Sequence, residues 1–450
     1  MKSLTFKGGV HPPENKELTS AYAIEEAMPS TKTVVIPITQ GGAPNVPCVS
    51  VGNSVAKGQI IADGTGAFSV PVHASIAGIV KKIEPHLVTG NTEALCIVIE
   101  ADGTDRTSYL PPLDPYSCEK AAAIERVRQC GIVGMGGAAF PAHVKLNVPA
   151  DKTVDCVIAN AAECEPYLTI DERSLLEETD KIVDGLAISM HLTGAKRGVI
   201  AIEDNKAYAV EHIEKVIAKA GKSDISVQLL KTKYPQGGEK MLVKSVLRRE
   251  IPSGKLPADA GCVIQNAGTL IAMSDAFRLG KPLVDRALTI SGGCCETPKN
   301  LRVPLGTLIG DLIPEVIKLK PGVKKIISGG PMMGFSMMNA QFPVQKNTSG
   351  VLFLSEKEVS LAAETPCIGC GNCVDVCSCR LTPVMMMRSV KADNLEAAIK
   401  YGLLDCNECG TCAYVCPAKV RLVQYFRLGK TKHREIMAKK AADAKKGADK

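Results

Sequence analysis

Two runs of cysteines decide how this sequence is interpreted. They read Cys367-Ile-Gly-Cys370-Gly-Asn-Cys373-Val-Asp-Val-Cys377 and Cys406-Asn-Glu-Cys409-Gly-Thr-Cys412-Ala-Tyr-Val-Cys416-Pro417, and they lie about forty residues apart. In this spacing three cysteines wrap a short loop around one face of a cubane cluster, while the fourth reaches the other cluster. The duplicated pattern therefore predicts two four-iron, four-sulfur clusters.

The same spacing predicts crossed ligation. One cluster would be held by Cys367, Cys370, Cys373 and Cys416, and the other by Cys406, Cys409, Cys412 and Cys377. A pair of structural zinc sites is the alternative, because CxxC pairs also bind zinc. Ser378 stands where a proline usually follows the fourth cysteine, and Cys379 is a competing ligand two residues beyond Cys377. The repeated spacing favours Cys377.

Composition limits the class of protein. The chain has 450 residues of which 45% are apolar, enough for two to four domains with real cores. Eighteen cysteines without an apolar leader at residues 1–7 indicate a reducing cytoplasm in which cysteines serve metals. No stretch is expected to span a membrane. The absence of tryptophan and 4% aromatic content argue against a nucleic-acid partner.

The net charge of +7 is concentrated in the final residues, 427–450. A solvated helix or disordered tail is the simplest interpretation of this Ala/Lys-rich segment, and contact with acidic lipid or an acidic protein is the alternative.

Strand and helix patterns divide the rest of the chain. Short β-branched runs between Gly and Pro turns over 34–99 predict a small all-β module. Predicted strands at 154–159, 198–202 and 225–230 alternate with predicted helices at 171–192, 206–220 and 239–249, which indicates a layered α/β domain. The expected divisions are 1–30 (N-terminal segment), 31–105 (β module), 106–285 (α/β domain), 286–355 (second β module), 356–425 (cluster domain) and 426–450 (basic tail).

Four short motifs in the α/β domain are candidates for a ligand site. Gly131–Pro141 would let the backbone approach a flat or phosphorylated ligand, although it is neither a P-loop nor a dinucleotide fingerprint, since a helix at 119–129 precedes it. Asn160–Pro166 directly follows a strand, where α/β sheets bind ligands. Tyr234–Glu239 and Gln265–Thr269 are the other two. Each alone is compatible with turn chemistry, but four in succession favour a site.

These strings, together with Phe6–Pro13 and Ile327–Gly334, resemble RnfC, a peripheral subunit of the Rnf electron-transport complex, over nearly the whole chain. The middle of that family is similar to the flavin-bearing, NADH-oxidising subunit of respiratory complex I. The resemblance implies a multidomain α/β fold with β modules: a Rossmann-like FMN/NADH domain, a lipoyl-like barrel-sandwich module, an SLBB-type β-grasp module and a ferredoxin-type helical domain with two [4Fe-4S] clusters.

The resemblance also implies roles for individual residues. Phe140 and Glu165 would face the nicotinamide nucleotide, and Lys145 would be a further polar contact to the cofactor. The residues implied for FMN are Gly134, Gly136, Asn160, Glu163, Cys164, Gly237, Glu239, Gln265, Asn266 and Thr269.

The function implied is electron transfer between NADH, FMN and the two clusters, at the NAD-facing end of an ion-translocating ferredoxin:NAD+ oxidoreductase. Its expected partners are the membrane subunits that move ions, a ferredoxin-like cluster subunit, NADH and ferredoxin, and its expected place is peripheral, on the cytoplasmic face of the cell membrane. A cobalamin reductase of a metabolic compartment and a cluster-carrying scaffold that does not oxidise NADH are the alternatives.

Overall fold

A parallel sheet forms the centre of the α/β domain in the computed structural model, which describes residues 2–448. The strand order is β11-β10-β9-β12 and every neighbouring pair is parallel. The bounds are Cys156–Ala161 for β9, Arg197–Glu203 for β10, Ile225–Leu230 for β11 and Cys262–Asn266 for β12. The three predicted strands are confirmed to within two residues, and β12 was not foreseen.

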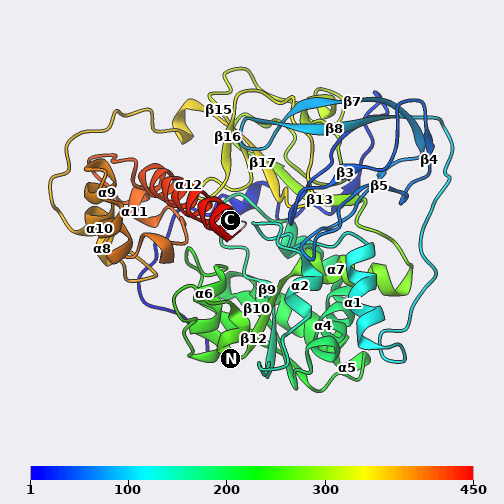
Figure 1. Cartoon of the computed structure of the whole chain (residues 1–450), viewed down its shortest axis with the longest axis horizontal. Coiled ribbons are helices and arrows are strands. Elements are labelled where there is room, and N and C mark those ends of the chain that lie inside the picture. The colour runs from blue at the N-terminus through cyan, green and yellow to red at the C-terminus, as the bar shows by residue number, and fades with distance from the viewer. Residues whose placement is uncertain (1, 449–450) are drawn as a thin grey trace.

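Helices cover both faces of this sheet (Figure 1). α4 (Thr179–Thr193), α5 (Val210–Lys219) and α7 (Ala267–Arg278) share a core with one face, while α6 (Glu239–Leu242) and the π-helical turn Val243–Leu247 pack on the other. The predicted helix 171–192 is two helices, α3 (Ile170–Glu177) and α4, because Glu178 has a non-helical backbone. α1 (Lys120–Gln129) and α2 (Ala142–Leu146) flank the glycine-rich motif.

The first β module consists of two antiparallel sheets that enclose an aliphatic core. One sheet has the order β2-β8-β7-β4 and the other β3-β5-β6. Val34, Ile36, Ile61, Val80 and Ile97 are among the fully buried side chains between them. The bounds are Thr33–Pro37 (β2), Val46–Pro47 (β3), Ser54–Val55 (β4), Ile60–Asp63 (β5), Val72–His73 (β6), Gly78–Val88 (β7) and Thr92–Ala101 (β8).

The second β module is a six-stranded mixed sheet in the order β1-β14-β13-β17-β15-β16. β13 and β17 run parallel at its centre, and β1, contributed by the N-terminal segment, pairs with β14 at one edge. The bounds are Ile24–Glu26 (β1), Asp285–Ser291 (β13), Lys299–Pro304 (β14), Lys325–Ser328 (β15), Phe335–Met337 (β16) and Gly350–Leu354 (β17).

The cysteine-rich part is helical and stands at one side of the molecule (Figure 1). It contains α8 (Asn372–Asp375), α9 (Pro383–Lys391), α10 (Leu395–Lys400), α11 (Thr411–Tyr414) and α12 (Leu422–Ala448). Leu422 and Phe426 are buried, so the helix that carries the basic tail begins inside this part of the core. The basic tail is helical up to residue 448, which is one of the two forms that the sequence allowed, and its last two residues lie outside the described chain. None of the helices in 2–448 has the length and apolarity that crossing a membrane requires.

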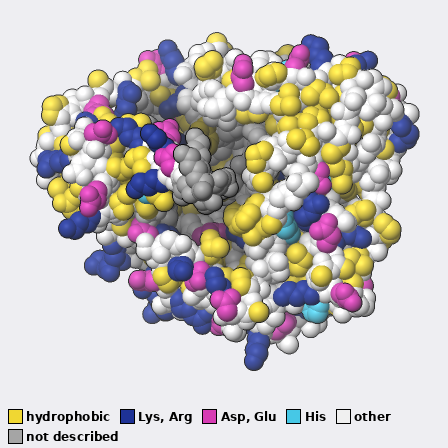
Figure 2. Space-filling model, viewed as in Figure 1, with side chains coloured by type: hydrophobic (Ala, Val, Ile, Leu, Met, Phe, Trp, Pro, Cys, Tyr) yellow, Lys and Arg dark blue, Asp and Glu magenta, His cyan; other side chains and the backbone are white. Residues whose placement is uncertain are grey.

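The N-terminal segment ties the α/β domain to the cysteine-rich part. Leu4 forms a bridge with Leu230 at the end of β11, and Val10 forms one with Tyr234. The Gly9 N–H donates to the carbonyl of Val376, 2.9 Å away. The opening motif of the sequence is therefore an inter-domain connector. Figure 2 shows a hollow near the centre of the visible face, beside the cysteine-rich part.

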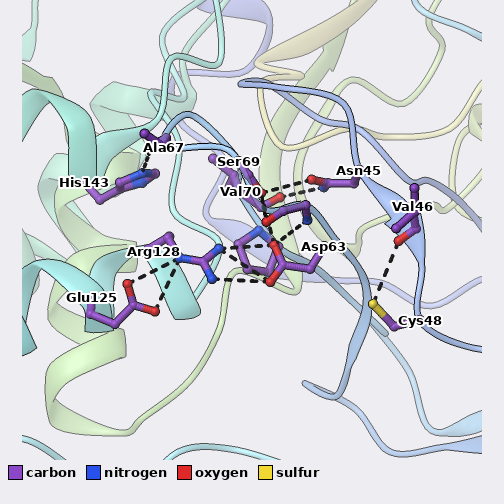
Figure 3. A network of polar contacts seen from close by, with 12 residues as sticks. Asn45, Val46, Cys48, Asp63, Ala67, Ser69, Val70, Glu125, Arg128 and His143 are labelled. Atoms are coloured by element: carbon purple, nitrogen blue, oxygen red, sulfur yellow. Dashed lines mark hydrogen bonds and ion pairs between the residues drawn. The ribbon is translucent and has the colours of Figure 1, made fainter.

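Polar contacts fasten the first β module to the helices that flank the glycine-rich motif (Figure 3). Arg128 of α1 pairs with Asp63 at 3.1 Å and with Glu125 at 3.3 Å. The ring nitrogen Nε2 of His143, on α2, lies 3.0 Å from the carbonyl oxygen of Ala67. The loop between β5 and β6 is therefore anchored to the α/β domain.

Candidate functional site

The topology of the parallel sheet places a crevice between β9 and β12. The chain runs from β9 to β10 and β11 on one side, and then returns to add β12 on the other side. Asn160 and Asn266, at the carboxyl ends of β9 and β12, are directly paired in register. Ligands of open α/β sheets bind outside the strand ends at such a switch point. The two predicted asparagines therefore meet where a ligand is expected.

The glycine-rich motif crosses this crevice and is held there by Thr269. The Met135 N–H donates to the Thr269 hydroxyl (3.0 Å), which in turn donates to the carbonyl of Val133 (3.2 Å). A Cβ on Gly136 would lie 3.2 Å from the Cβ of Asn266, whereas one on Gly137 would meet no atom within 4 Å. The loop thus presents bare, exposed backbone to open space.

The opposite wall is built by Asn160, Cys164 and Gly237. The Asn160 side-chain amide donates to the Gly237 carbonyl (2.8 Å), and the Gly237 N–H donates to the Cys164 sulfur (3.2 Å). Burial raises the pKa of the Cys164 thiol well above its usual range, so this sulfur stays protonated and is no nucleophile. At the start of α6, Glu239 pairs with Lys145 at 2.5 Å.

The unpaired, buried side chain of Gln265 indicates that these residues fit a polar cofactor. It lies on β12 with 1% of its surface exposed, and neither its amide oxygen nor its amide nitrogen has a partner among the described residues. Unpaired buried amides are rare because each costs about 1–3 kcal/mol. A polar group bound at this strand end would relieve that cost, so the donor set fits a flavin or nucleotide.

Glu163 has a role that its sequence position did not reveal. Its carboxylate accepts the N–H groups of Asp171 (2.7 Å) and Glu172 (3.1 Å) at the start of α3. Asp171, absent from the predicted set, accepts from the side chain of Asn266 at 2.8 Å. The Glu163 carboxylate is therefore committed to the helix, and Asp171 is the acid that touches the strand-end asparagine.

Lys16 is a second residue that sequence reasoning missed. Its buried ammonium donates to the carbonyls of Glu163 (2.9 Å), Glu165 (3.1 Å) and Leu168. Burial lowers the pKa of this lysine. The N-terminal segment thereby fixes the backbone of the predicted acidic motif, and no local sequence pattern signals a contact across about 150 residues.

Glu165 joins two of the predicted motifs. Its carboxylate accepts the N–H groups of Met332 (3.0 Å) and Met333 (2.9 Å), in the loop of the second β module. Burial raises the pKa of Glu165 to about 7, although the bonds from these amides oppose the shift. The side chain keeps part of its surface exposed. Its carboxylate fastens this loop to the motif that follows β9.

The second cysteine run surrounds a cavity of about 340 Å³ that opens to solvent. The cavity is lined by Cys406, Cys409, Cys412, Cys377 and Cys379. Burial raises the pKa of Cys406 to about 12, although the Glu408 amide and the Lys430 ammonium oppose the shift. Iron would deprotonate such thiols on binding. This grouping of Cys377 with the second run is the one that crossed ligation requires, and it leaves Cys379 close enough to compete.

This cavity borders the α/β site. The Tyr234 hydroxyl, from the third predicted motif, donates to the carbonyl of Cys409 at 2.7 Å. A Cβ on Gly410 would lie 2.9 Å from the carbonyl oxygen of Met332. The Lys240 ammonium donates to the carbonyl of Asp405 (3.2 Å). The cysteines of the second run are thus held against the ligand crevice.

Comparison with known families defines the class of protein. Residues 127–275 match the Nuo51 FMN-binding domain, residues 366–420 match a 4Fe-4S dicluster domain, and residues 4–104 match the RnfC barrel sandwich hybrid domain. The chain is a multidomain α/β flavin and iron–sulfur protein with a barrel-sandwich module, as the sequence predicts.

The particular family follows from full-length relatives. The chain is 44% identical to its counterpart in the proton-translocating ferredoxin:NAD(+) oxidoreductase complex of Clostridium ljungdahlii, over 96% of this chain and 94% of the relative. It is 41% identical to the corresponding component of the Na(+)-translocating complex of Acetobacterium woodii, over 85% of this chain and 87% of the relative. The chain belongs to the RnfC family.

A solved structure shares the fold. The NAD+-reducing [NiFe]-hydrogenase in its H2-reduced state aligns with a TM-score of 0.50 and 18% identity, covering 69% of this chain and 62% of that chain.

Proposed function

We propose that this chain is the NAD-facing electron-transfer subunit of an ion-translocating ferredoxin:NAD+ oxidoreductase, passing electrons between NADH, FMN and two [4Fe-4S] clusters. The observation that carries the proposal is the direct contact between the crevice and the second cysteine cavity through Tyr234 and Met332. Full-length similarity to the relatives from Clostridium ljungdahlii and Acetobacterium woodii favours this function over a cobalamin reductase.

The chain supplies binding, orientation and electrostatics. When bound, FMN supplies the conversion between hydride transfer and single-electron transfer. The exposed backbone of Gly136 and Gly137 would accept a flat ring, and Gln265 would meet its polar edge. Glu163 would contribute through its backbone, since its carboxylate caps α3. The proposed FMN residues are Gly134, Gly136, Asn160, Glu163, Cys164, Gly237, Glu239, Gln265, Asn266 and Thr269.

The dinucleotide would lie over the same loop. Phe140 and Glu165 would face it, with Lys145 as a further polar contact. The clusters would be held in the crossed arrangement, with Cys367, Cys370, Cys373 and Cys416 on one and Cys406, Cys409, Cys412 and Cys377 on the other.

Because Tyr234 bonds to the backbone of Cys409, the cluster of the second run would be the first acceptor of electrons from the flavin. Cys412→Ser, which disrupts that cluster, should leave the remaining cluster reducible by dithionite but not by NADH. Cys370→Ser is the matched control, since it disrupts the far cluster and should leave the near one reducible by NADH. Electron paramagnetic resonance measures the reduced cluster that remains in each variant. Reduction by NADH in Cys412→Ser but not in Cys370→Ser would reverse the proposed route.

An anaerobic titration of the purified, cofactor-loaded chain with NADH tests the function itself. Bleaching of the flavin absorbance by NADH supports the oxidoreductase, and unchanged flavin supports a cluster-carrying scaffold. The expected partners are the ion-moving membrane subunits, a ferredoxin-like cluster subunit and ferredoxin, with the chain bound peripherally at the cytoplasmic face of the membrane. Residues 286–355 are proposed as an SLBB-type β-grasp module, with the other divisions as the sequence predicts.

A further inference from the structure

Ser378 occupies the tight turn that follows the fourth cysteine of the first run. The turn begins at Cys377, whose carbonyl accepts the N–H of Arg380 at 3.0 Å. Ser378 stands at the second position of this turn, where proline is favoured because its ring fixes the backbone in the required conformation. The second run keeps a proline after its fourth cysteine, Pro417. The first run therefore has a hydroxyl in place of a residue that would stiffen the turn.

This hydroxyl is buried and has no partner. Ser378 keeps 8% of its surface exposed, and its Oγ forms no hydrogen bond with any residue of the described chain, 2–448. The Cys379 thiol is close to it without forming a hydrogen bond of ordinary geometry. Buried hydroxyls without partners are rare because they are costly. An alanine or a proline would avoid that cost, so the hydroxyl indicates a partner that the polypeptide itself does not supply.

The unpaired hydroxyl belongs to the cavity of the second cysteine run. Ser378 lines this space of about 340 Å³ together with Cys377, Cys406, Cys409 and Cys412. These four thiols are the ones proposed to hold the near cluster. The sulfur atoms of such a cluster accept hydrogen bonds. A cluster bound here would therefore offer the acceptor that Ser378 lacks.

Other groups in the wall of this cavity already face the sulfur atoms. The Leu381 N–H donates to the Cys377 sulfur at 3.3 Å, and the Thr411 hydroxyl lies 3.4 Å from the Cys409 sulfur. Hydrogen bonds to cluster sulfurs favour the reduced state, which carries one more negative charge, and so raise the reduction potential. Ser378 would add one more donor to this set.

We propose that the Ser378 hydroxyl donates a hydrogen bond to a sulfur of the near cluster and raises its reduction potential. The proposal rests on the proposed function, which assigns Cys377 to this cluster. On reduction the cluster gains one electron and the hydroxyl keeps its proton, so the hydrogen bond strengthens and no proton is transferred. Ser378 thereby favours electron transfer from the flavin to the near cluster.

A mediated redox titration of the cofactor-loaded chain, followed by electron paramagnetic resonance, tests this role. At a fixed potential, Ser378→Ala should lower the ratio of reduced to oxidised near cluster about tenfold, as expected for the loss of a hydrogen bond to a charged acceptor. This factor corresponds to about 59 mV for one electron. Ser378→Pro should show the same loss, whereas Ser378→Thr, which keeps the hydroxyl, should behave like the wild type. The signal that remains in Cys370→Ser identifies the near cluster.

Electron–nuclear double resonance on the reduced near cluster gives a second readout. Comparison of samples in H2O and D2O should show one exchangeable proton fewer coupled to this cluster in Ser378→Ala than in the wild type. Ser389→Ala is the control, because Ser389 is 9% exposed in the same part of the chain and does not line the cavity. It should change neither the proton couplings nor the potential. Iron analysis confirms that both clusters are present in each variant.

Two results would overturn the proposal. One is a Ser378→Ala variant with full iron content and the wild-type potential, which makes Ser378 a turn residue only. The other is an equal loss in Ser378→Thr, which assigns the effect to the shape of the turn. If alanine loosens the turn and iron is lost, Ser378→Pro replaces it, because proline stiffens the same turn and also lacks the hydroxyl. Failure of the proposed function is distinct, since the mediated titration uses no NADH, and wild-type flavin would then not be reduced by NADH.

Discussion

Replacing Glu165 by glutamine separates its contact with the Met332–Met333 loop from its proposed contact with the dinucleotide. The carboxylate accepts two backbone N–H groups, from Met332 and Met333. Glutamine offers one acceptor oxygen and one donor amide, so one of the two N–H groups would face another donor. An unpaired buried donor costs about 1–3 kcal/mol. Opening of the Met332–Met333 loop should therefore become between about fivefold and about 150-fold more frequent.

The opening of this loop can be measured by hydrogen exchange, with mass spectrometry on peptides that cover residues 329–334. Exchange at the Met332 and Met333 amides should accelerate in Glu165→Gln at constant pH, with FMN and iron retained. NADH turnover should fall and the flavin potential should rise, because a negative charge near the dinucleotide is removed. Glu358→Gln is the matched control, since Glu358 accepts the Gly293 N–H in the same module. It should speed exchange near Gly293 and leave NADH turnover unchanged.

Unchanged exchange at Met332 and Met333 in Glu165→Gln would show that the carboxylate does not hold this loop closed. Faster exchange with unchanged NADH kinetics would confirm the contact between Glu165 and the loop. It would exclude Glu165 from the nucleotide site.

The pKa of Glu165 adds a pH dependence. Because burial raises this pKa from 4.5 to about 7, the folded chain binds the proton more tightly than the unfolded chain. Stability from this carboxyl is complete below pH 4.5 and is lost as the pH rises to about 7, by on the order of 3 kcal/mol. Glu165→Gln lacks this loss, so its melting temperature relative to the wild type should improve between about pH 5 and about pH 8. An equal difference at both pH values would contradict the burial argument.

Three further predictions concern the cofactors. Iron analysis should give about eight irons per chain, whereas about four irons or stoichiometric zinc would contradict two cubanes. Cys377→Ser should damage the cluster of the second run and Cys416→Ser that of the first, and spectroscopy showing the reverse would refute crossed ligation. Gly136→Leu should expel FMN while the clusters survive, because the new side chain would fill the space beside Asn266 that the cofactor needs. Full flavin content in this variant would place the pocket elsewhere.

The sequence could predict what depends on local spacing. The cysteine repeat indicated two clusters, and apolar runs located β9, β10 and β11. The strand β12 was not predicted because its five residues, Cys262–Asn266, end in Gln and Asn, which are more typical of a turn.

Contacts between distant segments could not be predicted from the sequence. Lys16 and Glu165 each find partners about 150 residues or more away, and these partners are backbone atoms, which every residue type carries. Side-chain patterns in the sequence therefore cannot predict such hydrogen bonds. The capping of α3 by Glu163 spans only eight residues, and it too was not foreseen because its partners are backbone N–H groups, although both acidic residues of that motif were singled out.

The N-terminal connector also bears on biosynthesis. Gly9 bonds to the carbonyl of Val376, which leaves the ribosome roughly 370 residues later, or about 20–70 s at ordinary rates of translation. Until then the opening segment can pair with β11 of the flavin domain but has no partner on the cysteine-rich side. Closure of the connector is therefore a late step in the folding of the chain.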